Sequence, residues 1–181
     1  MTHAERILGR LDCHLTSRVE LTLYGRAALT LGFGQTPEDY ALSHDVDAVL
    51  WLGQAEALNE STNFWQAVDR TNAELADEDL YVSHFFTEDQ VVLLPDWRDN
   101  RIPLPGDWKH LVLYRLGNLD LVLSKLMRDD PIDRFDALFI VRSAALTAED
   151  VRAAVARAVL PESEEIHEQF ASASARLLKS L

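Results

Sequence analysis

The hydrophobic periodicity of the chain changes near residue 116, and this change restricts the fold more than any other feature of the sequence. Before it, apolar residues alternate in short runs such as residues 18–24 and 45–51, a pattern typical of half-buried strands. After it, apolar residues recur at helical spacing. We therefore expect an α+β fold, with a small mixed β-sheet and flanking helices in residues 1–116. A helical bundle in residues 117–181 would pack on this core as one cooperative unit.

Local patterns predict the individual elements. A short helix is expected just after Gly25, and Pro131 suits the first turn of a helix in the C-terminal part. Asn118 is the expected N-cap of the helix over residues 119–127. Further helices are predicted over residues 2–14, 62–76, 119–127 and 131–142, and further strands over residues 80–86, 90–94 and 110–114.

The charge balance excludes one class of partner. The formal net charge is −13, whereas proteins that bind duplex nucleic acid without sequence preference carry a basic face. Residues 27–69 contain seven carboxylates and no Lys or Arg. For most of these carboxylates a solvated acidic surface is the simpler interpretation, and Asp45 and Asp47 are the exceptions.

Other features predict a soluble cytoplasmic protein without a membrane segment. The N-terminus lacks the basic start and apolar run of a signal peptide, and the longest apolar stretches are too short to span a bilayer. Cys13 is the only cysteine, so an intramolecular disulfide is impossible. No pair of His or Cys residues has zinc-ligand spacing. The last helix is expected to pack on the core or on a second subunit, which leaves a homodimer open.

Asp45 and Asp47 open the predicted strand at residues 45–51. On a strand, residues i and i+2 point to the same side, so the two carboxylates converge and repel unless a cation or hydrogen bonds compensate. Carboxylate oxygens suit Mg²⁺, which binds proteins through a few carboxylates together with substrate phosphates. Gly25, at the preceding strand-to-helix turn, allows the backbone to approach a phosphate. We expect a magnesium site here.

This arrangement resembles the DNA-polymerase-beta-type nucleotidyltransferase superfamily, in which a glycine-containing turn precedes an Asp-x-Asp strand. The resemblance rests on Leu21–Leu29 (LTLYGRAAL) and Ser43–Leu50 (SHDVDAVL). Two later runs, Asn118–Arg128 and Asp133–Asp136, are similar to the helices of the abortive-infection-toxin-like branch, which is associated with toxin–antitoxin systems. Together these runs span roughly residues 20 to 140.

The resemblance implies transfer of a nucleoside monophosphate from a nucleoside triphosphate to a protein or RNA acceptor such as tRNA. Asp45 and Asp47 would ligate Mg²⁺, Gly25 would lie against the triphosphate, and Lys125 would offer a charge to a phosphate. Arg26 stands where the superfamily has a small residue, and it would either bind a phosphate or close the pocket.

A third carboxylate is the least determined part of this site. The superfamily places it on a later central strand, for which the natural candidate is residues 90–94, and that run has no acid. Asp96, just beyond it, is the best candidate, with Glu88 and Asp89 just before it as alternatives. Without a third carboxylate, the same fold would serve as a nucleotide- or protein-binding module that has lost catalysis.

Overall fold

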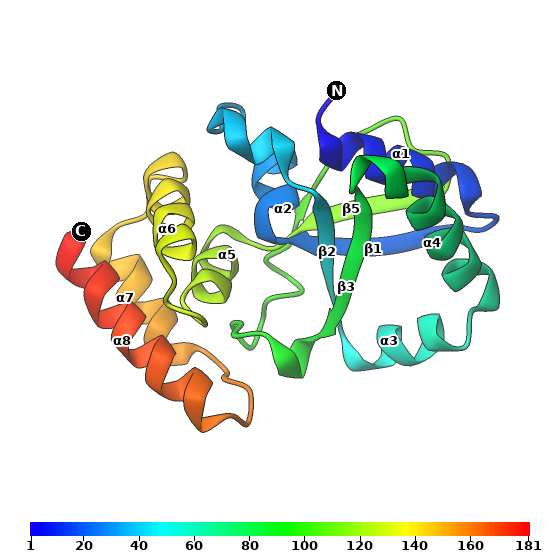
Figure 1. Ribbon diagram of the computed structural model, residues 1–181. Helices are drawn as coiled ribbons and strands as arrows, with labels where there is room; N and C mark the ends of the chain where they lie inside the picture. The colour runs from blue at the N-terminus through cyan, green and yellow to red at the C-terminus, as the bar shows by residue number, and fades with distance from the viewer. The chain divides into compact units, whose positions relative to one another are not determined.

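The computed structural model describes residues 1–181 and divides the chain into two compact units (Figure 1). The first comprises Met1–Thr87 and Ile102–Arg115 and contains the whole β-sheet. The second comprises Glu88–Arg101 and Leu116–Leu181 and contains the last four helices. The protein is therefore α+β, with eight α-helices and a five-stranded mixed sheet.

The sheet has the strand order β3-β2-β1-β5-β4. Its central strand, β1 (Val19–Tyr24), runs antiparallel to β2 (Asp45–Leu50) and parallel to β5 (Leu111–Arg115). Strand β3 (Tyr81–Thr87) is parallel to β2, and the two-residue β4 (Ile102–Pro103) is antiparallel to β5. The sequence did not predict β4, which is very short and contains a proline that only an edge strand tolerates.

Four helices belong to the first unit: α1 (His3–His14), α2 (Gly25–Gly32), α3 (Leu52–Asn59) and α4 (Thr62–Leu75). Helices α1 and α4 pack on each other, and they contact β2 and β3 respectively. Helix α2 contacts β1, β2 and a 3₁₀ turn at Glu38–Leu42. The helices predicted over residues 2–14 and 62–76 are confirmed as α1 and α4.

A single buried carboxylate ties α1 to the start of β5. Both oxygens of Asp12 are used: Oδ2 accepts from the Lys109 N–H at 2.8 Å, and Oδ1 accepts from those of His110 and Leu111 at 2.8 and 2.7 Å. Burial raises the pKa of Asp12, but these backbone donors outweigh it and hold the pKa below its ordinary value. These hydrogen bonds connect two segments about a hundred residues apart in the sequence and hold α1 against the start of β5.

The second unit contains α5 (Asn118–Lys125), α6 (Pro131–Ser143), α7 (Ala148–Arg157) and α8 (Glu164–Ser180). Helix α5 packs on α6 and α7, and α8 packs on both α6 and α7. The N-cap residues Asp130, Thr147 and Ser163 each accept a hydrogen bond from the first turn of the following helix. The N-cap of α5 is Gly117, so the prediction of Asn118 is wrong by one residue.

The strand predicted over residues 90–94 does not form. The segment begins with a 3₁₀ turn, Glu88–Gln90, and has one isolated bridge between Leu93 and Val159. The Leu94 N–H donates to Asp120 instead of to a strand, and the Val92 N–H lies 3.2 Å from the sulfur of Met127. A short apolar run looks the same in sequence whether a sheet or a helical bundle buries it.

None of the eight helices combines the length and hydropathy needed to cross a bilayer.

Candidate metal- and phosphate-binding site

Asp45, Asp47 and Gly25 lie together at one end of the β1–β2 pair. Asp45 and Asp47 are half-buried on β2, whereas Val46 between them is buried. Tyr24, the last residue of β1, pairs with Asp47, so Gly25 follows directly beside that carboxylate. A Cβ atom at Gly25 would lie 3.3 Å from Asp47 Oδ2, and Gly25 has φ +71°, which favours glycine. The antiparallel register thus joins the glycine turn to the Asp-x-Asp strand.

Helix α2 begins at Gly25, and its first turn has backbone N–H groups that need acceptors. Tyr24, at the N-cap, makes no side-chain hydrogen bond to them. The side chain of Arg26 is held by the 3₁₀ turn: its guanidinium lies 3.2 Å from the Asp39 carboxylate and stacks 4.7 Å from the Tyr40 ring centroid. The uncapped start of a helix beside a carboxylate pair suits an anion that is bridged to the carboxylates by a cation.

A β-bulge in β3 faces Asp47. The pairing of β2 with β3 runs from Val46 with Val82 to Ala48 with Phe85, so Ser83 and His84 lie opposite the single residue Asp47. The His84 N–H lies 3.4 Å from Asp47 Oδ1, and the imidazole Nδ1 lies 3.8 Å from the same oxygen. The Ser83 hydroxyl is hydrogen-bonded to His84 Nδ1 and also to the Asp47 carboxylate.

Sequence reasoning missed Ser83 and His84, because the predicted strand over residues 80–86 does not by itself show which strand it pairs with. The strand beside β2 is β3, and it has no carboxylate. The two consecutive polar residues, Ser83 and His84, interrupt the alternation of the strand, and this interruption is the one local signal that could have located the bulge.

Carboxylate charges shift the pKa values of neighbouring groups at this end of the sheet. Burial, followed by the charge of Asp45, raises the pKa of Asp47 in spite of the hydrogen bonds from Ser83 and His84. Asp45 is also the main cause of a raised pKa at the neighbouring Tyr81. A carboxylate pair whose mutual repulsion the protein compensates only in part favours a bound cation.

The other predicted site residues, Asp96 and Lys125, belong to the second unit, where each has partners. Asp96 Oδ1 accepts from Arg157 at 3.1 Å. Lys125 is buried, and its ammonium donates to Asp133 at 3.0 Å and to Asp136 at 2.8 Å. The Lys125 cluster is thus an internal ion-pair network of the helical unit.

Glu88, the alternative third acid, also belongs to the second unit. Its carboxylate accepts from the indole N–H of Trp97 at 2.9 Å. Asp89 follows it in the same 3₁₀ turn.

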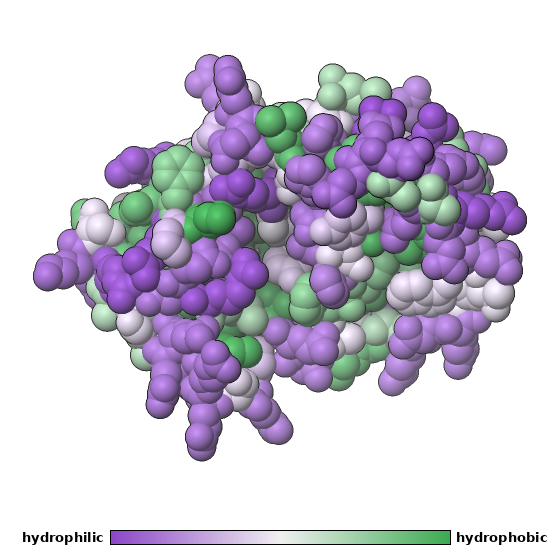
Figure 2. All heavy atoms as spheres, in the orientation of Figure 1, coloured by the Kyte–Doolittle hydropathy of each residue, from purple (hydrophilic) through white to green (hydrophobic).

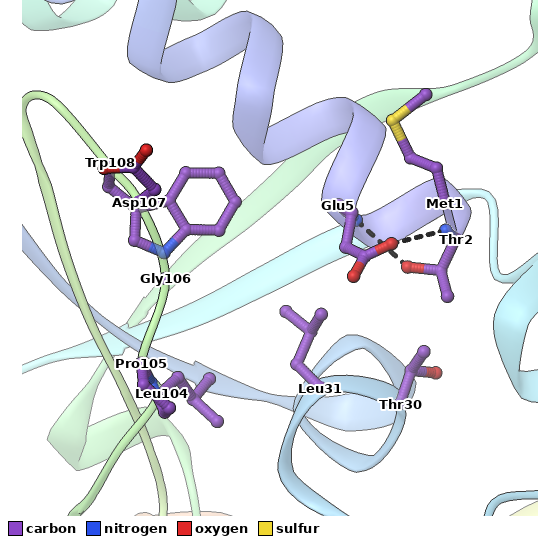
Figure 3. Close-up of a pocket in the computed structure, with 10 residues that line it drawn as sticks. All are labelled: Met1, Thr2, Glu5, Thr30, Leu31, Leu104, Pro105, Gly106, Asp107 and Trp108. Atoms are coloured by element: carbon purple, nitrogen blue, oxygen red, sulfur yellow. Dashed lines mark hydrogen bonds between the residues drawn. The ribbon is translucent and has the colours of Figure 1, made fainter.

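A separate pocket of about 460 Å³ lies in the first unit, between the start of α1, α2 and the loop before β5 (Figure 3). The figure shows the Trp108 ring facing this space from the loop and Glu5 facing it from α1. The Glu5 carboxylate already accepts from the Thr2 N–H at 2.7 Å as part of the capping box of α1. None of the predicted site residues lines this pocket.

No group of three or more His, Cys, Asp or Glu side chains is placed to hold a metal ion. Asp45 and Asp47 are two carboxylates, so a Mg²⁺ ion held by them would need phosphate oxygens and water to complete its shell. Comparison with protein-family models, curated proteins and solved structures finds no match.

Proposed function

We propose that the protein is a magnesium-dependent nucleotidyltransferase whose metal–triphosphate site consists of Asp45, Asp47 and the turn at Gly25. The observation that carries the proposal is the position of the turn: a Cβ at Gly25 would lie 3.3 Å from Asp47 Oδ2. A phosphate that approaches the start of α2 would therefore lie beside the Asp47 carboxylate. This is the arrangement that the resemblance to the polymerase-beta-type superfamily predicts.

A bound Mg²⁺ would neutralise charge on the phosphates during an in-line displacement. An acceptor hydroxyl oxygen would attack the α-phosphorus, and the bond from that phosphorus to the oxygen bridging the α- and β-phosphates would break. Pyrophosphate would leave with the bonding electron pair, and the hydroxyl proton would pass to solvent. The resemblance adds a protein or tRNA acceptor and a toxin–antitoxin role to the proposal.

The residues of the chain have separate tasks in this scheme. Asp45 and Asp47 hold the cation, and Gly25 leaves room for a phosphate where any side chain would crowd Asp47. Ser83 and His84 position the Asp47 carboxylate through the bulge. These tasks involve the first unit alone.

A specific observation favours a second candidate function. Strand β3, next to the carboxylate strand, presents Ser83 and His84 to Asp47 and carries no third carboxylate. A site with two carboxylates can hold a metal–nucleotide complex without turning it over. The second candidate is therefore a nucleotide-binding module that has lost catalysis.

The first experiment measures thermal unfolding with each nucleoside triphosphate, with and without Mg²⁺. The wild-type chain should be stabilised by at least one triphosphate only when Mg²⁺ is present, by about 2.7 kcal/mol at a ligand concentration of ~100 times Kd. Asp47→Asn should lose the shift, and Asp69→Asn, a matched change at an exposed carboxylate on α4, should keep it. An equal shift in the wild-type chain and Asp47→Asn would show that Asp47 does not hold the complex.

Release of pyrophosphate from the same triphosphate separates the two candidates. The enzyme should form pyrophosphate when protein and tRNA acceptors are supplied, and Asp47→Asn should not. Magnesium-dependent binding without pyrophosphate would favour the binding module. No shift with any nucleotide would overturn both candidates.

A further inference from the structure

Three rings, those of Tyr24, His84 and Phe86, lie beside the Asp47 carboxylate and form what we call the aromatic platform. The Phe86 ring makes an edge contact with the Tyr24 ring at 5.7 Å between centroids and lies 5.2 Å from the imidazole of His84. The His84 side chain is 69% exposed, and Tyr24 and Phe86 are half-buried. Figure 2 shows apolar side chains at the surface over the region where Figure 1 draws the end of β3, the strand that carries two of these rings.

The sheet register puts Tyr24 and Phe86 on the same side as the Asp47 carboxylate. Tyr24 pairs with Asp47, and Phe86 pairs with Val49, which follows Asp47 by two residues. The opposite side of the sheet is covered at this point, because Phe85 packs against two rings of α4. A rise of about 3.3 Å per residue sets Phe86 roughly 7 Å along the sheet from Asp47. The ribose of a nucleotide spans a gap of this size between its phosphates and its base.

Both basic residues predicted to contact a phosphate are already engaged within the protein. The Arg26 guanidinium lies against the Asp39 carboxylate and the Tyr40 ring. Lys125 is buried in its own ion-pair network. A metal–triphosphate complex therefore gains little affinity from these two side chains. Aromatic rings can supply affinity at another part of the nucleotide, since a base stacks on them without any cation.

We propose that the aromatic platform stacks the base of the nucleoside triphosphate whose phosphates lie at Asp47, and that it favours purines over pyrimidines. The inference rests on the proposed function, because the phosphates fix where the base lies. A purine has two fused rings and therefore makes more contacts with the platform. Stacking does not read the edges of a base, so the platform by itself accepts adenine and guanine alike.

A nucleobase of an RNA acceptor offers the same chemistry as the base of the triphosphate. The triphosphate is favoured because the platform contacts the proposed cation ligand itself. The imidazole Nδ1 of His84 lies 3.8 Å from Asp47 Oδ1, and the His84 N–H lies 3.4 Å from the same oxygen. A base held on these rings thus belongs to the molecule whose phosphates share the metal ion.

Isothermal titration calorimetry in the presence of Mg²⁺ compares ATP, CTP and inorganic tripolyphosphate, which has three linked phosphates and no base. The wild-type chain should bind ATP more tightly than CTP, and CTP more tightly than tripolyphosphate. Phe86→Leu should weaken ATP binding about fivefold or more and leave tripolyphosphate binding unchanged. Phe135→Leu, the same change at a 54% exposed ring of the second unit, should bind all three as the wild-type chain does.

The outcomes separate the platform from the metal site. Equal weakening of ATP and tripolyphosphate by Phe86→Leu would overturn the inference, since Phe86 would then only support the carboxylates. Tripolyphosphate that binds as tightly as ATP, with no effect of Phe86→Leu on either, would overturn the platform alone and leave the metal site standing. No binding of any of the three ligands to the wild-type chain would overturn the proposed function together with this inference.

A short single-stranded RNA distinguishes the two sources of a base. Binding of this RNA that depends on Phe86, with unchanged binding of ATP, would overturn the inference in favour of an acceptor base. Circular dichroism checks the fold of each variant, and Tyr24→Leu tests the platform independently if Phe86→Leu does not fold.

Discussion

Replacement of Asp120 by Asn should remove a pH dependence of the stability of the helical unit, so that the variant gains stability relative to the wild-type chain as the pH rises. Asp120 is fully buried in α5. Its Oδ1 accepts from the Leu94 N–H at 2.8 Å, and its Oδ2 has no hydrogen-bond partner. Burial, with a smaller contribution from the charge of Asp96, raises the pKa of Asp120 from 3.8 to about 6, although the bond from Leu94 opposes the shift.

The magnitude follows from proton linkage. A rise of about two pKa units corresponds to ~3 kcal/mol between the two protonation states. Because the folded pKa lies above the unfolded value, the stabilisation is fully present below pH 3.8 and is lost as the pH rises through about 6. Asn can still accept the hydrogen bond from Leu94 but does not ionise. At alkaline pH, Asp120→Asn should therefore be more stable than the wild-type chain by up to ~3 kcal/mol relative to their difference in acid.

Urea unfolding followed by circular dichroism measures this effect. The free energies of unfolding of the wild-type chain and Asp120→Asn are compared at several pH values between about 4.5 and 8, so that groups common to both cancel in the difference. The difference should grow in favour of Asp120→Asn up to about pH 7 and then level off. A difference that stays constant with pH would refute the reasoning, because Asp120 would then not titrate between the two states in this range.

Three further changes test other contacts by urea unfolding. Lys125→Met leaves the buried carboxylates of Asp133 and Asp136 without their ammonium partner and should cost ~3–5 kcal/mol; a cost near zero would contradict this. Asp12→Ala strands three backbone N–H groups and should cost about 3 kcal/mol at neutral pH. Since the folded pKa of Asp12 is lowered, the deficit of Asp12→Ala should shrink as the pH falls below 3.8. Thr147→Ala removes the capping box of α7 and should cost about 1 kcal/mol, whereas Thr147→Ser should cost almost nothing.

The sequence predicted the parts of the fold that depend on local periodicity. The alternation in residues 45–50 is enough to place both carboxylates on one side of a strand, and the structure buries Val46 and Ala48 on the other. The adjacency of Gly25 and Asp47 depends in addition on antiparallel pairing of β1 with β2. The connection between those two strands, residues 25–44, contains α2 and a 3₁₀ turn, so its length does not determine that pairing. The sequence suggested the adjacency only through the resemblance.

Other parts of the candidate site depend on pairing that local sequence does not encode. The bulge that sets Ser83 and His84 against Asp47 arises from a one-residue shift in the β2–β3 register. The Lys125 cluster depends on a tight reversal between α5 and α6, where Asp129 has φ +51°. An aspartate tolerates that conformation, yet nothing in the sequence requires it there.

The central claim is that Asp45 and Asp47 hold a divalent cation together with a nucleoside triphosphate. Electron paramagnetic resonance of Mn²⁺, which shares the oxygen-ligand preference of Mg²⁺, measures bound metal directly in the wild-type chain and in the Asp45→Asn, Asp47→Asn double variant. The account predicts that the triphosphate strengthens Mn²⁺ binding to the wild-type chain and that the double variant binds neither tightly. Equal Mn²⁺ binding by the two proteins in the presence of the triphosphate would contradict it.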